Sequence, residues 1–562
     1  MNRPSRNEDV LPHPTWNQSP LELAADLTTR QDLNGIANVT EQKGLDTKTL
    51  GDQARAIVKE SEILPLRLLP AAAGVASAGE PSQGHARRND ASWKSSVSYL
   101  PCRIWEILTK YTKFIGPGFL IAVAYIDPGN YATDVAAGAN TKFSLLFIVL
   151  LSNLFAIFLQ SLSIKLGSVT GLNLAENCKA HLPKWLTILL YILAEAAIIA
   201  TDIAEVVGSA IALNLLLRVP LVAGCAITMV DVLVILIFYR PNGSMAAVRA
   251  FEWFVMAIVL GVVVCFCIEL SLIRDTSAGE VFRGYLPSAA VIESNGLYLS
   301  CGILGATVMP HSIFLGSSVV QSRLRHFDLG EAHRNAAAAT SRNPEDVKYR
   351  PSPAAIRHCL RYSVTELALS LFTFALFVNS AILIVAGSSL FGNIEASEAD
   401  LFGIHKLLSD TIAPAAGTVF ALALLLSGLS AGIVCTMTGQ IVSEGMLNWR
   451  IAPWLRRLIT RSISIVPSII IAAAVGKDGL NATLAATQVV LSAILPFVTA
   501  PLIYFTSLNR YMTVPGGVAA GDNTEGVRLR NHWAVTALGL MVWLAIAVMN
   551  VALLVLVGLG KM

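Results

Sequence analysis

Long apolar runs follow one another closely from residue 113 to the end of the chain. Each approaches or exceeds the roughly 20 apolar residues that an α-helix needs to cross a bilayer. Short segments richer in polar, Gly and Pro residues separate the runs. This pattern predicts an all-α polytopic membrane protein with about 11 transmembrane helices. The predicted spans are 113–136, 143–167, 184–213, 221–239, 250–272, 295–321, 360–387, 414–440, 457–475, 482–508 and 533–558.

The first 100 residues differ in composition from the rest. They are rich in Ser, Asn, Asp, Pro and Gly, and they hold no sustained apolar periodicity. Such a segment buries too little apolar surface to offset the entropy of folding. We therefore predict a disordered tail over residues 1–100 and a transmembrane domain over residues 101–562.

Composition supports the membrane assignment. Of the 562 residues, 54% are hydrophobic and 14% are charged, against about 25% charged in an ordinary soluble domain. The mean hydropathy is +0.61. These values exclude a soluble enzyme, a disordered scaffold and a secreted disulfide module. The net charge of +3 gives no sign of a nucleic-acid partner, and the eight scattered cysteines form no CxxC pair, so we expect them to be small core residues.

The distribution of Lys and Arg between the spans predicts their orientation. The segment after the seventh run holds Glu395, Glu398, Asp400 and Asp410 against Lys406 alone. Even-numbered spans are therefore expected to end in the cytosol, with the N-terminal tail cytosolic and the C-terminus outside or lumenal. The basic residues are Arg323, Arg325, Arg334, Arg342, Lys348, Arg350 and Arg357 after the sixth run, Arg450, Arg456 and Arg457 after the eighth, and Arg510, Arg528 and Arg530 after the tenth.

Proline and glycine interrupt the first and the sixth runs near their middle. Proline removes a backbone donor, and freed carbonyls are tolerated at membrane depth only where they line a cavity or are buried in protein. If helices 1–5 and 6–10 form two repeats, the interruptions match, which indicates a substrate site at the bilayer midplane. Ordinary proline kinks are the alternative. The breaks lie at Asp127, Pro128, Gly129 and Asn130 in GFLIAVAYIDPGNYATDV, and at Met309, Pro310 and His311 in GILGATVMPHSIFLGSSVV.

The polar groups at these breaks indicate the ligand. A carboxylate such as Asp127 in mid-membrane is costly unless it is functional, and it would repel an anionic substrate and attract a divalent cation. Met309 adds a soft thioether, whereas Ca²⁺ and Mg²⁺ prefer oxygen cages. Together with the amide of Asn130 and the imidazole of His311, the donors favour Mn²⁺, Fe²⁺ or a neighbouring transition metal. Singly, Met309 could be core filler, His311 a core histidine or proton carrier, and Asn130 a helix cap.

The DPGN and MPH sequences resemble the signature of the natural resistance-associated macrophage protein (Nramp) family. The similarity continues through TDIAEVVGSAIALNLLL, LITRSISIVP and TQVVLSAILPFVTAPL, and it covers residues 113–508. The long N-terminal tail and MPHSIFLGS are similar to the fungal branch. The resemblance implies a leucine-transporter-type inverted repeat and a transporter domain over residues 101–562. It also implies proton-coupled symport of divalent ions such as Mn²⁺ and Fe²⁺ into the cytosol.

The resemblance also implies a set of metal ligands. These are the side chains of Asp127, Asn130, Met309 and Gln488 and the backbone carbonyls of Ala124 and Ala306. Gln488 could equally form a hydrogen bond between helices. The metal ion and the proton are substrates, so no cofactor is expected.

Three carboxylates lie on one stripe of the third span, because Glu195, Asp202 and Glu205 are spaced by seven and three residues. Inside a membrane such a stripe must face a polar cavity or a basic partner, and Arg461 is the natural counter-charge. The resemblance assigns Asp202, Glu205 and Arg461 to a proton path, with His311 nearby. A charge network that only holds two helices together is the alternative.

One position departs from the family pattern. Many members carry a second histidine five residues after that of MPH, where this chain has Gly316. Any proton role of that histidine is therefore absent here or relocated.

Other charges in the spans receive simpler interpretations. Asp231, Glu252 and Glu269 lie near the ends of their runs and are expected to reach the membrane interface. Asp134 and Glu366 lie deeper, and we expect neither to be a direct ligand.

Competing functions are weaker. An organic-solute transporter is disfavoured by Asp127 and Met309, while a metal channel remains an alternative. An intramembrane protease or a P-loop pump would need HExxH or GxxxxGK[ST], and neither occurs; a receptor would not need the DPGN break. The lipid bilayer is an expected partner, in the plasma membrane or in an endosomal or vacuolar membrane. The tail and the loop after the sixth span could engage trafficking or ubiquitination machinery through Lys43, Lys48, Lys59, Lys94 and Lys348.

Overall fold

Helices account for nearly all of the regular structure, and each predicted apolar run coincides with helix. The computed structural model describes residues 116–237, 245–273, 276–335, 349–392, 401–447, 453–474, 477–514 and 526–559, so the predicted tail lies outside the described residues. The uninterrupted long helices are α7 (Leu146–Thr170), α9 (Lys184–Leu217), α10 (Leu221–Ile237), α11 (Met245–Leu272), α19 (Pro414–Leu447), α20 (Pro453–Ala474), α21 (Lys477–Ser507) and α22 (Trp533–Gly558).

Three predicted spans are interrupted helices. The first is split into α5 (Pro117–Val123) and α6 (Pro128–Thr141), and the sixth into α13 (Ser294–Thr307) and α14 (Pro310–Asn335). Both breaks fall where the sequence predicts them. The seventh passes from α15 (Pro353–Ser370) through a π-turn, η2 (Leu371–Ala375), into α16 (Leu376–Ser389), which the apolar pattern does not predict.

Eight helical segments among the described residues are long and apolar enough to cross a membrane. They include Asn295–Glu331 and Pro353–Ser389, each taken across its interruption. The other three predicted spans are the split pair α5–α6, the 17-residue α10, and α20, whose apolar part is Arg461–Ala474. The chain is an integral multi-pass membrane protein, and the count of about eleven spans stays a prediction.

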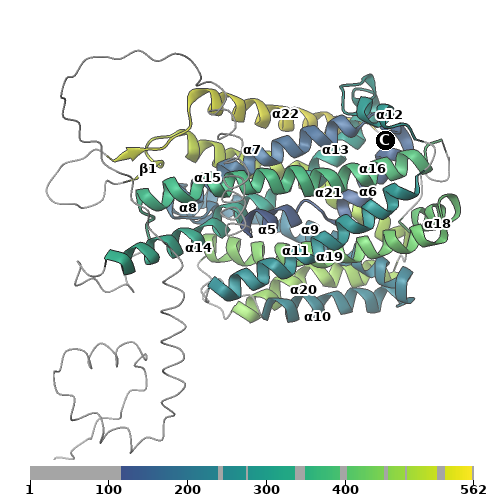
Figure 1. Ribbon diagram of the computed structural model, residues 1–562, viewed down its shortest axis with the longest axis horizontal. Helices are drawn as coiled ribbons and strands as arrows, with labels where there is room; N and C mark the ends of the chain where they lie inside the picture. Colours follow the sequence, from purple (N-terminus) through teal and green to yellow (C-terminus); the bar gives the residue numbers. More distant parts are fainter. Residues whose placement is uncertain are drawn as a thin grey trace, which may run out of the picture. The chain divides into compact units, whose positions relative to one another are not determined.

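The short elements gather at two opposite ends of the helices (Figure 1). We call them the α8 end, where α8, β1 and the last turns of α14 lie, and the α18 end, where α12 and α18 lie. Among the described residues, the elements that follow the second, sixth and tenth runs therefore share one end, and those after the fifth and seventh runs share the other. The short elements are α8 (Leu174–His181), α12 (Ala278–Gly284), η1 (Ala289–Val291), α18 (Leu401–Thr411) and the antiparallel pair β1 (Thr513–Val514) and β2 (Val527–Arg528), with Thr513 opposite Arg528.

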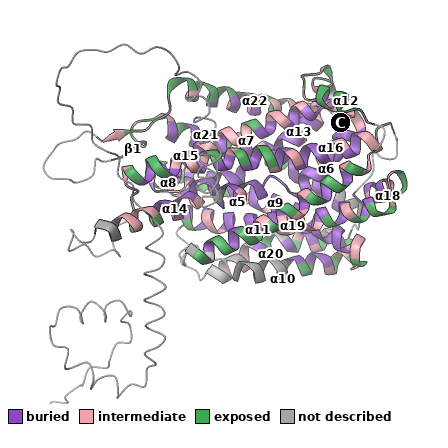
Figure 2. Cartoon of the chain, viewed as in Figure 1, coloured by how far each residue is buried: buried purple, intermediate pink, exposed green. Residues whose placement is uncertain are grey.

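Apolar side chains cover the outer helices, and many polar ones are buried in the interior. Exposed hydrophobic residues run along α22, including Met541 at 62% and Leu544 at 57% exposure, and Trp185 at the start of α9 is 67% exposed. Figure 2 shows the buried residues concentrated on the inner helices such as α6 and α19. This distribution is inverted relative to a soluble protein and fits a lipid-facing surface.

The structure corrects one expectation about charged positions. Glu252 and Glu269 are both buried within the protein, and Glu252 forms an ion pair with Arg323 at 3.4 Å. Arg323, which we counted as a loop cation, lies inside α14, because this helix continues to Asn335, well beyond the predicted run. The side chain of Asp231 lies outside the described residues.

The cysteines have the expected character of small core residues. Those described as free and buried are Cys178, Cys225, Cys265, Cys301, Cys359 and Cys435, whereas Cys267 is exposed.

Glycines allow the interrupted helices to approach their neighbours closely. A Cβ at Gly167 of α7 would overlap the carbonyl oxygen of Ser317 on α14, and one at Gly208 of α9 would overlap Pro128 at the start of α6. Small residues at such contacts are the usual way in which membrane helices gain packing energy. Close packing against glycine therefore holds Pro128 at the first break and the backbone of α14 after the second.

We expect Gly167→Ala to destabilise the protein by about 1–3 kcal/mol, because the added methyl group must displace the backbone of α14. A thermal melt of the purified protein in detergent measures this. Gly439→Ala on α19 is the matched control, since its Cβ would meet only Ile198 Cγ2 at 3.6 Å. Equal melting temperatures of the two variants would contradict the close-approach interpretation.

Candidate metal centre

The first break is organised around the carboxylate of Asp127. Asp127 is the N-cap of α6: its Oδ2 accepts the N–H of Gly129 and its Oδ1 accepts the N–H of Asn130, each at 3.1 Å. Asn130 Nδ2 also donates to Asp127 Oδ1 at 2.7 Å. The carboxylate is thus fixed at the positive end of a helix dipole, beside the amide of a second predicted ligand.

The two prolines explain why Ala124 and Ala306 present free carbonyls. Pro128 has no N–H to donate to the carbonyl four residues earlier, which is that of Ala124. Pro310 leaves the carbonyl of Ala306 without its helical donor for the same reason. This four-residue spacing is a signal that reasoning from the residues alone could have used, instead of relying on family resemblance.

Neighbouring helices satisfy the remaining carbonyls of the first break. The carbonyl of Tyr125 accepts from Asn130 Nδ2 at 3.0 Å and from Asn379 Nδ2 of α16 at 3.2 Å. The carbonyl of Ile126 accepts from Ser427 Oγ of α19 at 2.9 Å. The unwound segment is therefore held open by side chains from α16 and α19.

Gln488 of α21 connects the two breaks. Its side chain covers Gly129, where an added Cβ would overlap Gln488 Nε2. Its backbone carbonyl faces α13, since a Cβ at Gly305 would lie 2.8 Å from Gln488 O. A second link joins Tyr125 Oη in the first break to Ser312 Oγ at the start of α14, 3.0 Å apart.

All six predicted metal-binding residues are buried, and two of them offer unpaired oxygens. Asp127, Asn130 and Met309 are 0% exposed and Gln488 is 1% exposed. Asn130 Oδ1 and Gln488 Oε1 have no hydrogen-bond partner in the described part of the chain. Buried acceptors without donors are rare in proteins. Hard oxygen acceptors, a carboxylate and a thioether sulfur suit a divalent transition-metal ion.

His311 leads from the second break to the charged stripe on α9. Its Nδ1 lies 3.2 Å from Thr201 Oγ1, and the next residue on α9 is Asp202. Asp202 is ion-paired with Arg461 of α20, and Glu205 Oε2 lies 3.7 Å from Arg461 Nη1. A continuous set of buried polar groups therefore extends from α14 to α20.

The group of residues around the α9 carboxylates differs from the predicted one in two members. Glu195 is half-buried beside Tyr191, two turns nearer the α8 end, and is not among the described ion pairs of Arg461. Cys435 of α19, which the sequence did not single out, has its Sγ within 4.8 Å of the carboxylates of Asp202 and Glu205. No pattern in the sequence links α19 to α9 at that level.

Gln160 of α7 fills the space beside Gly316. A Cβ at Gly316 would overlap Gln160 Oε1, while Gln160 Nε2 donates to Tyr125 Oη and to Ser312 Oγ, each at 2.9 Å. A side chain at position 316 would need the volume that Gln160 occupies. In place of a second histidine, this chain has a hydrogen-bond network that ties α7 to both breaks.

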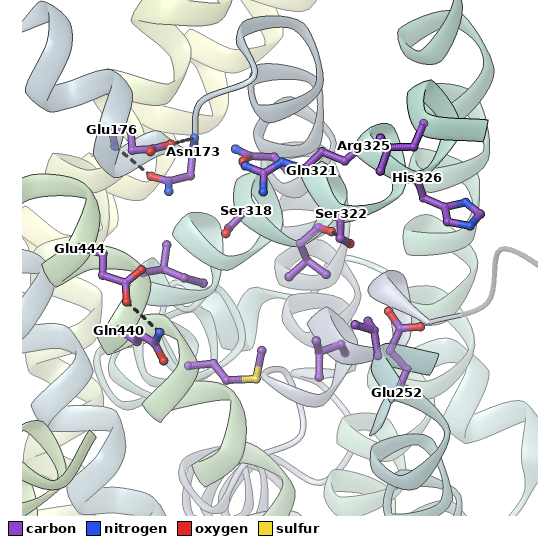
Figure 3. Close-up of a pocket in the computed structure, with 16 residues that line it drawn as sticks. Asn173, Glu176, Glu252, Ser318, Gln321, Ser322, Arg325, His326, Gln440 and Glu444 are labelled. Carbon is purple, nitrogen blue, oxygen red and sulfur yellow. Dashed lines mark hydrogen bonds between the residues drawn. The ribbon is translucent and has the colours of Figure 1, made fainter. Parts of the chain in front are cut away.

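A cavity of about 530 Å³ opens at the α8 end, next to α5 (Figure 3). Leu120 of α5 lines it, one helical turn before Ala124 in the first break. Its lining is mixed in charge, and Figure 3 shows Glu444 bound to Gln440 on one side and Arg325 with His326 on the other. We call it the α8-end cavity.

Charged residues hold the start of α5 beside this cavity. Glu366 Oε1 of α15 accepts the N–H of Gly116 at 2.6 Å and that of Gly118 at 3.2 Å. The Glu252–Arg323 pair lies against Gly116, where a Cβ would overlap Glu252 Oε2. The half-helix α5 thus lines the α8-end cavity through Leu120, and its start is held by these side chains.

Comparison with known proteins agrees with this geometry. Residues 118–556 match the family described as natural resistance-associated macrophage protein-like. This chain belongs to the Nramp family. It is 50% identical to the manganese transporter SMF1 of Saccharomyces cerevisiae over 500 residues, covering 81% of this chain and 87% of the relative. It is 53% identical to the iron transporter SMF3 of the same yeast over 411 residues, covering 73% and 84%.

Solved structures of this family share the fold. The crystal structure of the Eremococcus coleocola manganese transporter superimposes with a TM-score of 0.64 at 30% identity, covering 83% of this chain and 88% of that one. The fold is thus a leucine-transporter-type arrangement with broken first and sixth helices. The family consists of metal transporters, so the protein is not an enzyme.

We expect Arg461→Gln to destabilise the protein by about 3–5 kcal/mol, because it leaves Asp202 and Glu205 buried without their counter-charge. Detergent melts of the purified protein measure the loss. The double variant Arg461→Gln with Asp202→Asn should regain much of it, since one uncompensated charge is removed. A double variant less stable than Arg461→Gln alone would contradict the ion-pair assignment.

Proposed function

We propose that this Nramp protein is a proton-coupled symporter that moves divalent transition-metal ions such as Mn²⁺ and Fe²⁺ into the cytosol. The observation that carries the proposal is the buried site at the two helix breaks, where Asp127, two unpaired amide oxygens and Met309 accompany two freed carbonyls. The relatives named as manganese and iron transporters support the same substrates.

The donor set favours transition metals over the abundant hard cations. Asp127, Asn130 and Gln488 supply oxygens, and the carbonyls of Ala124 and Ala306 supply two more. Met309 supplies a sulfur atom, which Ca²⁺ and Mg²⁺ do not favour as a ligand. Selection against Ca²⁺ and Mg²⁺ is therefore assigned to Met309, and binding strength mainly to Asp127.

The proton is proposed to follow the polar groups from His311 to the α9–α20 charges. His311 contacts Thr201, and Asp202 and Glu205 follow on the same helix against Arg461. Glu195 lies further along α9 toward the α8 end and extends this path. Because Gln160 takes the place of a second histidine beside Gly316, the path uses His311 alone on α14.

Alternating access is proposed to depend on α5. The basic segments after even-numbered spans place the α8 end in the cytosol, so the α8-end cavity is the cytosolic vestibule. Release of metal then requires α5 to move away from Glu366 and the Glu252–Arg323 pair. The N-terminal tail is cytosolic, the C-terminus is outside or lumenal, and the plasma membrane or an endosomal or vacuolar membrane is the proposed location.

Asp127→Ala should abolish Mn²⁺ uptake into proteoliposomes, because the site loses its carboxylate. Met309→Leu should retain Mn²⁺ uptake while Ca²⁺ or Mg²⁺ begins to compete, because the thioether is removed at nearly constant volume. Uptake is followed with a metal-sensitive dye, and Glu269→Gln, a buried carboxylate on α11, is the control. Normal uptake by Asp127→Ala would mean that the breaks serve another substrate.

Wild-type Mn²⁺ uptake should acidify the vesicle lumen, as read by a trapped pH dye. We expect Glu205→Gln to reduce the protons moved per Mn²⁺ more than it reduces Mn²⁺ uptake itself, because it removes one carboxylate of the path. A separate assay of Mn²⁺ flux gives the ratio. Mn²⁺ uptake without acidification in the wild type would identify an uncoupled carrier or channel instead of a symporter.

A further inference from the structure

Asp134 is a buried carboxylate that the site described above does not use. It lies on α6 and is 0% exposed, and neither of its oxygens has a hydrogen-bond partner in the described residues. It follows Asn130 by four residues, so the two side chains lie on one face of α6 with their Cβ atoms about 5–6 Å apart. The Oδ1 atom of Asn130 is also unpaired. Asp134 therefore lies one helical turn beyond the predicted ligands, toward the α18 end.

The two helices that flank the Asp134 face of α6, α13 and α16, offer it no cation in the described residues. On one side Thr133 of α6 meets α13, with Thr133 Cγ2 3.3 Å from a Cβ placed at Gly302. On the other side Gly138 of α6 meets α16, with the carbonyl of Leu383 2.6 Å from such a Cβ. Asp134 lies between these two contacts around α6. Neither α6, α13 nor α16 contains a Lys, Arg or His residue.

Asp127 is the N-cap of the same half-helix, so two ionised carboxylates on α6 would repel each other. An ionised carboxylate in such a place is strongly unfavourable unless a positive charge lies close by. Of the two cations that the proposed function moves, the metal ion carries two charges and is proposed to bind at the adjoining break.

The predicted ligands carry too little negative charge to neutralise a bound divalent ion. Among the six groups, Asp127 alone is anionic, so a bound divalent ion would retain one uncompensated positive charge. On α9, Asp202 and Glu205 share the single positive charge of Arg461, with Glu205 Oε2 3.7 Å from Arg461 Nη1. Asp134 differs from both because it lies on the broken helix itself and has no ion pair in the described residues.

We infer that Asp134 is the second carboxylate of the metal centre: it does not coordinate the divalent ion but neutralises its remaining charge from one helical turn away. The inference rests on the proposed function. Asp134 would then be a positioning residue: its negative charge would raise the affinity of the site for divalent ions without touching them. A charge effect of this kind acts alike on hard and soft divalent ions, whereas a ligand such as Met309 discriminates between them.

The test compares Mn²⁺ and Cd²⁺ uptake by the full-length protein in proteoliposomes. We expect Asp134→Asn, which keeps the shape and removes the charge, to raise the KM at least about tenfold for both ions by the same factor. The maximal rate should change much less than the KM. Asp134→Glu should restore most of the affinity, because the charge is restored.

Glu269→Gln is the matched control, since Glu269 is also 0% exposed and both its oxygens are unpaired in the described residues, but it lies on α11. We expect its KM to equal that of the wild type. If Asp134→Asn does not yield folded protein, Asp134→Ser, which is neutral and smaller, replaces it in the same assay.

Three results would overturn the inference: an unchanged KM in the neutral variants, a KM raised for one ion but not the other, or an equal shift in Glu269→Gln. These outcomes are distinct from failure of the proposed function, in which the wild-type protein itself would not transport Mn²⁺.

Discussion

The structure depends on two backbone carbonyls that have no helical donor. Pro128 and Pro310 cannot supply the N–H groups that Ala124 and Ala306 would accept in a continuous helix. In a membrane such groups must be satisfied by protein, water or ligand. Asn379 and Ser427 satisfy the adjoining carbonyls of the first break, which leaves Ala124 as an open acceptor. The proposed metal centre is thus built first from a backbone defect and only then from side chains.

Hydrogen bonds to carboxylates and ion pairs position the helices around these two carbonyls. The N-terminus of α6 and the amide of Asn130 hold the carboxylate of Asp127, and Arg461 of α20 pairs with Asp202 and Glu205 of α9. Glu366 binds the first N–H groups of α5 at the α8 end. In a medium that penalises unpaired charge, each of these contacts specifies a helix position. The clamp on α5 and the proposed proton path each contain a buried ion pair, Glu252–Arg323 and Asp202–Arg461.

Much of the fold could be predicted because lipid imposes length and apolarity on every span. The runs, both breaks and the alternation of ends were predictable from the sequence. The extension of α14 to Asn335 was not, since its last turns are polar. For the same reason Arg323 looked like a loop residue, although it pairs with Glu252 in the interior. The π-turn within the seventh span could not be predicted either, because the apolar pattern continues through it unchanged.

For the candidate site, the sequence by itself determined the chemistry: a carboxylate, an amide and a thioether at two proline breaks, because residue type and proline position are local properties. Only the tertiary structure decided which distant groups join them. It brought Gln488 between the breaks, placed Cys435 beside the α9 carboxylates and put Gln160 over Gly316. These contacts join helices hundreds of residues apart or depend on the absence of a Cβ atom, and packing alone sets them.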